Sequence, residues 1–152
     1  ALAWDLADAF GKRELSRALA ILRQLVFQKE NVIGLVMGLE NRIRELLIYR
    51  EALERGWLVS KQGYGGRPSL GWGTLEPELE QIFAEQMGRD PRKIHPFRVS
   101  LLGEQARKFS MKRLRYCLAQ VTEAHATLVS SRIPQEMTLE FLLIRMLATA
   151  RG

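Results

Sequence analysis

Apolar side chains recur at intervals of three and four residues along most of this chain, and that spacing restricts how the chain can fold. Between residues 12 and 28 the apolar positions share one side of a helix, while the lysines and arginines occupy the other side. No segment shows the alternation of apolar and polar residues that indicates a β-strand. The sequence therefore predicts an all-α fold, a compact bundle of about five to seven helices.

Capping and helix-breaking residues divide this pattern into separate helices. Gly11 is expected to end a short first helix, and Asn31 and Gly56 are suitable start and stop residues for a long third helix. Four further helix starts are predicted from residues that favour N-caps or first turns, namely Pro77, Pro96, Ser110 and Thr138.

Two glycines at a spacing of four, Gly34 and Gly38, lie within the predicted third helix. Small residues at this spacing allow two helices to approach closely. The pair is therefore interpreted as a packing contact with another helix of the same domain.

Residues 57–75 interrupt the helical pattern. The segment is rich in glycine and contains Trp57 and Trp72. A connection of this length is unusual within a compact domain, so the sequence predicts one long insertion loop that is either mobile or functional. Its aromatic rings could stack on exposed nucleobases or pack back on the helices.

The positive charge of the chain is concentrated in one segment. The chain has 23 Lys and Arg against 17 Asp and Glu, a net charge of +6. Residues 89–115 hold nine basic and two acidic side chains, a net +7, so the rest of the chain is almost neutral. This segment is either a solvated basic face or a surface for phosphate contacts that do not read base sequence. Its cations are Arg89, Arg92, Lys93, Arg98, Arg107, Lys108, Lys112, Arg113 and Arg115.

Length and composition limit the class of protein further. A chain of 152 residues is sufficient for one domain. The single cysteine, Cys117, cannot form an intrachain disulfide, which fits a reducing compartment, and no stretch is apolar enough for a membrane span. The chain begins with Ala1, and Asp5 and Asp8 do not fit a signal peptide, so we expect a C-terminal fragment of a longer subunit.

The residues that could perform chemistry do not form a recognisable set. His95 and His125 have no partner at metal-ligand spacing, and Cys117 has no second cysteine nearby in the sequence. On one helix, Cys117 and His125 would lie about 12 Å apart, too far for one to activate the other. Cys117 is therefore interpreted as a core residue, and we expect no catalytic, cofactor-binding or metal-binding residues.

The last predicted helix is apolar on nearly every side. Leu139, Leu142 and Leu143 form the main apolar stripe of this helix, while Phe141 and Ile144 lie on other faces. A helix that is apolar all round must be covered on both sides. We therefore predict a subunit interface on this helix, formed by Phe141, Ile144 and Met146.

A series of short motifs occurs in one order along nearly the whole chain. The most specific are His95-Pro96-Phe97 and the segment Gln105-Ala106-Arg107-Lys108-Phe109-Ser110, and weaker ones cover residues 5–10, 38–51 and 139–143. In this order the motifs resemble the C-terminal (collar) domain of the bacterial DNA polymerase III delta subunit, a clamp loader component.

The resemblance implies a single helical collar domain over residues 1–152 that serves in oligomerisation. In this family the collar holds delta in the pentameric clamp loader with the gamma/tau and delta-prime subunits, and upstream domains engage the sliding clamp that is loaded on DNA during replication. Delta subunits usually lack a working ATP site, so the resemblance implies no enzyme activity and no cofactor. It also implies a cytoplasmic location, with the nucleoid-associated replication machinery.

Two features depart from the family pattern. His125 and Val129 stand where members often carry Asp and Lys four residues apart, so that ion pair is absent, and residues 57–75 look like an insertion. A different function class also remains open, in which the helical domain binds DNA non-specifically through residues 89–115.

Overall fold

The computed structural model describes residues 1–148, and residues 149–152 of the predicted domain lie outside that range. The described chain is mostly helical, as predicted, with one small β-sheet in addition. None of its helices is long and apolar enough to cross a membrane. The helices are α1 (Ala3–Gly11), α2 (Leu15–Phe27), α3 (Val32–Glu54), α4 (Pro77–Gln81), α5 (Pro96–Ala106), α6 (Met111–Ser130) and α7 (Gln135–Leu147).

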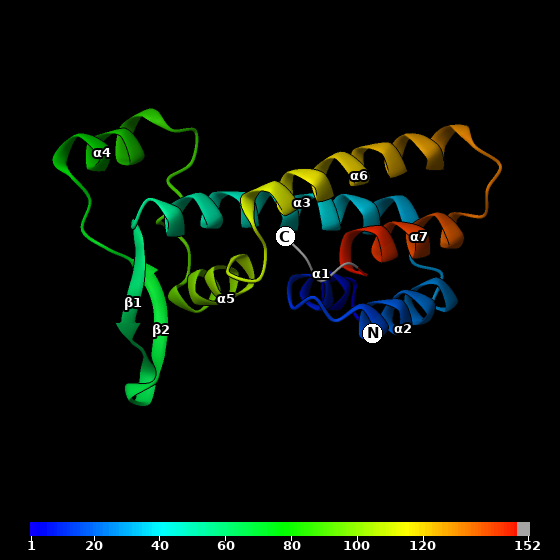
Figure 1. The fold of residues 1–152 in the computed structure, drawn as a ribbon, viewed down its shortest axis with the longest axis horizontal. Coiled ribbons are helices and arrows are strands. Elements are labelled where there is room, and N and C mark those ends of the chain that lie inside the picture. The colour runs from blue at the N-terminus through cyan, green and yellow to red at the C-terminus, as the bar shows by residue number, and fades with distance from the viewer. Residues whose placement is uncertain (149–152) are drawn as a thin grey trace.

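Helix α3 is the axis of the fold. It runs along the length of the molecule and contacts α1, α5, α6 and α7 (Figure 1). Helix α6 lies along one side of α3 (Figure 1). At one end of α3 lie α1, α2 and α7, and α5 lies beside its other end (Figure 1). Apolar residues of α3 supply the centre of the core, where Leu39, Ile43 and Leu46 are buried.

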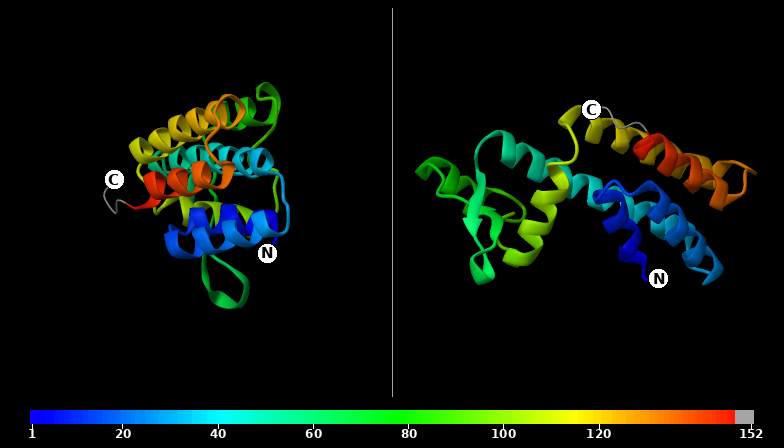
Figure 2. Two further views of the ribbon diagram at one scale, coloured as in Figure 1. Left: turned by 90° about the vertical axis from the view of Figure 1, so that its right-hand side faces the viewer. Right: turned by 60° about the horizontal axis from the view of Figure 1, so that its bottom comes forward.

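The segment predicted to be a long loop is a β-hairpin, which corrects the expectation of a purely helical chain. Strand β1 (Leu58–Gln62) pairs antiparallel with β2 (Pro68–Trp72), from Leu58 opposite Trp72 to Gln62 opposite Pro68. The hairpin projects from the helical body in both views of Figure 2. Its alternation was too weak to predict, because Leu58 is the only buried residue of β1 and Leu70 the only buried residue of β2.

The base of the hairpin is anchored on α5 by close packing. A Cβ atom added to Gly103 would lie 2.8 Å from Leu70 Cδ1 and 2.9 Å from Leu58 Cδ2, so this position of α5 requires a glycine. The backbone N–H of Leu70 also donates to Ser100 Oγ at 3.2 Å.

The two tryptophans of the hairpin segment pack back on the body of the domain, one of the two arrangements considered for them. The rings of Trp57 and Trp72 meet Phe83 edge to face, with centroid distances of 5.5 Å and 5.9 Å. Phe83 lies in the single π-helical turn, Ile82–Gln86, that continues α4. Trp72 also contacts Tyr49 of α3, so the aromatic cluster ties the hairpin and α4 to the central helix.

Two predicted N-caps are confirmed and one is wrong. Asn31 Oδ1 accepts from the backbone N–H of Gly34 at 3.0 Å, and Ser110 Oγ accepts from that of Arg113 at 2.9 Å. Thr138 does not cap α7, because that helix already begins at Gln135 and the Thr138 side chain is buried inside it.

Close approach of two helices occurs at Gly11 and not at the glycine pair predicted for it. A Cβ at Gly38 would meet no atom within 4 Å, and one at Gly34 would meet only Asn31, so no helix within residues 1–148 is in close contact with this pair. At Gly11 of α1, a Cβ would lie 1.9 Å from Gln105 Oε1 of α5. The absence of a side chain at Gly11 therefore leaves the space that the Gln105 side chain of α5 occupies.

Replacement of Gly11 by alanine tests this contact. We expect Gly11→Ala to lower the free energy of unfolding by about 1–3 kcal/mol, because the added methyl group displaces Gln105. In a Gln105→Ala background the same substitution should be neutral or stabilising by up to about 1 kcal/mol, because alanine favours a helix. Urea unfolding of the unmodified chain, the two single variants and the double variant gives the coupling energy between Gly11 and Gln105. If the changes in the free energy of unfolding of the single variants add up to that of the double variant within about 0.5 kcal/mol, the contact is contradicted.

Candidate interaction surfaces

A buried polar cluster joins α1, α3 and α5. Arg42 of α3 is only 5% exposed, and its Nη1 donates to Asp8 Oδ1 at 2.8 Å and to Gln105 Oε1 at 3.0 Å. Its Nε lies 3.6 Å from Glu45 Oε1, and Glu45 in turn accepts from Arg98 of α5 at 2.9 Å. A buried guanidinium needs such partners, so these contacts determine how the three helices meet.

An aromatic contact joins α1 to the connection between α5 and α6. The rings of Phe10 and Phe109 stack with a centroid distance of 5.2 Å. The guanidinium of Arg13 lies 4.9 Å from the Phe109 ring centroid and donates to the backbone carbonyl of Lys108 at 2.9 Å. Together with the Ser110 cap, these contacts fix the segment from Gln105 to Ser110, which connects α5 to α6, against the start of the chain.

The motif His95-Pro96-Phe97 begins α5 and also presents an aromatic ring to solvent. Pro96 occupies the first helical position, as predicted, and His95 Nδ1 accepts from the backbone N–H of Phe97 at 3.1 Å. The His95 and Phe97 rings stack with a centroid distance of 6.0 Å, and Phe97 is 78% exposed. An aromatic side chain this exposed, held by its neighbour, is a candidate contact residue.

Helix α7 places two of its three predicted interface residues at the surface. Phe141 is 53% exposed and Ile144 is 38% exposed, and they lie one turn apart. Met146 is fully buried in the core, so its inclusion in the predicted interface is corrected. The inner side of α7 packs on α2 and α6, and the side that carries Phe141 and Ile144 is left uncovered by the described chain.

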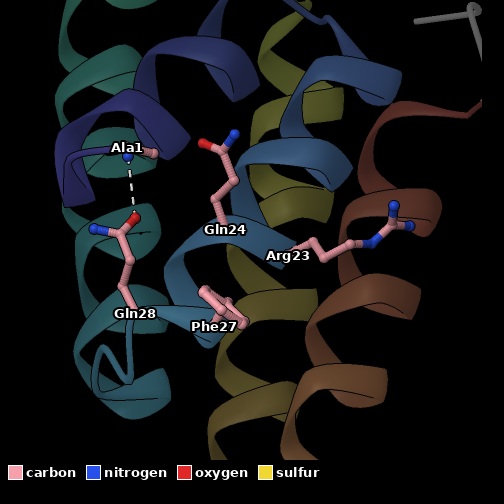
Figure 3. Close-up of a pocket in the computed structure, with 5 residues that line it drawn as sticks. All are labelled: Ala1, Arg23, Gln24, Phe27 and Gln28. Atoms are coloured by element: carbon pink, nitrogen blue, oxygen red, sulfur yellow. Dashed lines mark hydrogen bonds between the residues drawn. The ribbon is translucent and has the colours of Figure 1, made fainter.

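Helix α2, which packs beside α7, adds a further exposed ring. Phe27 is 87% exposed and lines a shallow pocket together with Ala1, Arg23, Gln24 and Gln28. Figure 3 shows these side chains on the outer side of α2, with Arg23 extending toward α7. Arg23 is the only charged side chain among them, so the pocket offers apolar contact and no pair of groups for acid–base chemistry.

The basic segment is not one continuous patch, because several of its cations bind other groups of the domain. Arg92 pairs with Asp90 and Glu80, and these hydrogen bonds lower the pKa of both carboxyl groups. Arg98 pairs with Glu45, Arg107 pairs with Glu104, and Arg113 donates to the carbonyls of Arg145 and Met146 at the end of α7. Five exposed cations of the segment have no ion pair within residues 1–148, namely Arg89, Lys93, Lys108, Lys112 and Arg115.

Cys117, His95 and His125 form no common site within the described residues. Burial raises the pKa of the Cys117 thiol to about 11, so it is protonated at neutral pH and packs as a core residue. His95 serves as the N-cap of α5, and His125 is half-buried on α6. Within the described residues, no three or more His, Cys, Asp or Glu side chains gather in a way that could hold a metal ion.

Comparison with known proteins agrees with this architecture. Residues 79–146 match the family model described as the DNA polymerase III delta subunit, C-terminal domain. The DNA polymerase III subunit delta of Bacillus subtilis is 25% identical over 144 residues, which cover 95% of this chain and 34% of that protein. The solved structure of the Bacillus subtilis DNA clamp loader delta protein superposes with a TM-score of 0.65 at 24% identity, over 97% of this chain and 36% of that one.

These matches show the class of fold and a similarity to one family. The fold is that of a helical domain from a clamp loader delta protein, and the chain spans about a third of the length of these relatives. Over residues 79–146 the chain is similar to the C-terminal domain of DNA polymerase III delta subunits, and the similarity to the Bacillus subtilis protein extends over nearly the whole chain.

Proposed function

We propose that this domain is an oligomerisation (collar) domain, which holds its delta subunit in a pentameric clamp loader with gamma/tau and delta-prime subunits. The observation that carries the proposal is the uncovered side of α7, where Phe141 and Ile144 are exposed although the opposite side of the helix is part of the core. The rest of the parent subunit would engage the sliding clamp that the complex loads on DNA. The domain itself would contribute binding and no catalysis, in the cytoplasm with the replication machinery.

The energetics of the exposed side favour a protein partner. Full burial of one Phe or Ile side chain stabilises a complex by about 1.5–3 kcal/mol. Aromatic anchors of this kind often carry a large share of the binding energy of an interface. Phe27 of α2 and Met137 of α7 are also exposed, and they would extend the same apolar contact.

Substitution of the two exposed residues tests the proposal. In the delta subunit that carries this domain, Phe141→Asp together with Ile144→Asp should weaken assembly with gamma/tau and delta-prime by about a hundredfold or more, because two charges would be buried without partners. Native mass spectrometry and sedimentation measure the assembled fraction.

The matched control carries the same change at two exposed apolar residues elsewhere, Met37→Asp and Val59→Asp. This control should assemble as the unmodified subunit does. Equal assembly by both double variants would contradict a role for α7 in the interface.

A second candidate function is non-specific DNA binding through the basic segment. Two observations favour it. Five exposed cations of the segment have no ion pair within residues 1–148, and the exposed ring of Phe97 lies in the same segment of the sequence. Cations bind phosphates and release counterions, and an exposed ring can stack on a base of single-stranded DNA. The two functions are compatible, because a ring of subunits can enclose DNA.

Salt dependence separates the two contributions to DNA binding. Removal of two cations by Lys112→Ala and Arg115→Ala should reduce the slope of log affinity against log salt by about 1.4 for single-stranded DNA. Phe97→Ala should weaken binding by about 1–3 kcal/mol and leave the slope unchanged, because stacking releases no counterions. Arg23→Ala with Arg132→Ala is the control of equal charge, and a slope that is the same in both double variants would contradict the DNA contact.

A further inference from the structure

An apolar groove lies where α3, the base of the hairpin, the π-helical turn and the start of α6 meet. Its volume is about 500 Å³, and it is lined mainly by apolar side chains. Ile48 of α3 and Met87, which follows the π-helical turn, are exposed at its edges. No residue of α7 lines it, so it is separate from the surface proposed for subunit assembly.

The floor of this groove is built from side chains that hold one another in place. The rings of Trp57 and Trp72 pack on Phe83 at interplanar angles of 88° and 87°. Tyr49 of α3 supports Trp72 from the core side, at a centroid distance of 5.9 Å. A floor fixed in this way is preformed, and it would lose little conformational entropy when a ligand binds.

One cation lines the groove, and two more are close in the sequence to residues that line it. Arg115 lines the groove, Arg89 lies in the chain between the lining residues Met87 and Pro91, and Lys112 follows the lining residue Met111. None of these three cations has an ion pair within the described part of the chain. The carboxylate among the lining residues, that of Glu51, is already neutralised by Arg55 at 2.9 Å.

We propose that this groove binds a peptide segment of another protein that has a large apolar side chain flanked by acidic residues. The apolar side chain would occupy the space between Ile48, Met87 and the tryptophans, and the flanking carboxylates would lie near Arg89, Lys112 and Arg115. Charge complementarity of this kind increases the association rate and the specificity of a peptide contact.

The lining favours a peptide over a nucleic acid. Stacking of bases requires open ring faces, whereas Trp57 and Trp72 are half-buried and pack edge to face against Phe83. The remaining walls are the flexible aliphatic and thioether side chains of Leu47, Ile48, Met87 and Met111, which adapt to an apolar side chain.

Binding of a defined probe to the 152-residue chain tests this proposal. The probe is a short fluorescein-labelled peptide with a central Leu-Phe pair and three aspartates on each side, followed by fluorescence anisotropy. Tryptophan emission in a Trp4→Phe background gives a second readout, because the two tryptophans that remain, Trp57 and Trp72, both line the groove. We expect saturable binding that weakens about tenfold or more in Ile48→Asp and in Arg115→Glu, where tenfold corresponds to about 1.4 kcal/mol.

The controls make every outcome decisive. Ile133→Asp and Arg132→Glu carry the same changes at exposed residues that do not line the groove and should bind as the unmodified chain does, and thermal melting verifies that all variants are folded. A peptide with serines in place of Leu-Phe should bind at least about tenfold more weakly. The proposal is overturned if that peptide binds equally well, if the groove variants bind like their controls, if no probe binds at millimolar concentration, or if a single-stranded oligonucleotide binds more tightly with the same dependence on Ile48.

Discussion

The packing of α1, α3 and α5 depends on the hydrogen bonds of the buried Arg42 guanidinium. A charge in this position is tolerated because Asp8 and Gln105 accept its hydrogen bonds, and these two residues come from α1 and α5, which both contact α3. Loss of one partner of a fully buried pair costs about 3–5 kcal/mol, and the cost here is lower because about a third of the Asp8 side chain is exposed. Gln105 is also the residue whose side chain lies against Gly11, so the same residue links α5 to both α3 and α1. The hairpin rests on α5 at Gly103, so its position follows from the same contacts.

The residues that carry the family resemblance and the residues available for partners are largely different sets. Asp8, Arg42, Gln105 and Phe109 act inside the domain, where they hold helices together. The exposed groups lie elsewhere, on the outer side of α7, at Phe97 and around the groove between α3 and the hairpin. Relatives can therefore share this frame while their surfaces differ.

Much of the fold could be predicted from the sequence, because helical periodicity and N-caps are local signals. The starts of the third helix at Asn31 and of α6 at Ser110 are examples, and both caps form the expected hydrogen bond. The hairpin could not be predicted, because one buried leucine in each strand produces no alternation. On α7, apolar residues on all sides left no local signal to separate the buried Met146 from the exposed Phe141, since their burial depends on where α2 and α6 pack. The same limit applies to the basic segment, where Glu45 and Glu80 neutralise arginines that are far from them in the sequence.

The central functional claim is that the domain contributes its outer α7 surface to a subunit interface while its internal frame stays unchanged. Hydroxyl-radical footprinting with mass spectrometry measures this directly, on the delta subunit alone and on the assembled complex with gamma/tau and delta-prime. The account predicts that oxidation of Phe141 and Ile144 falls severalfold on assembly, whereas oxidation of the buried Met146 stays low in both states. Unchanged oxidation of Phe141 and Ile144 in a fully assembled complex would contradict it.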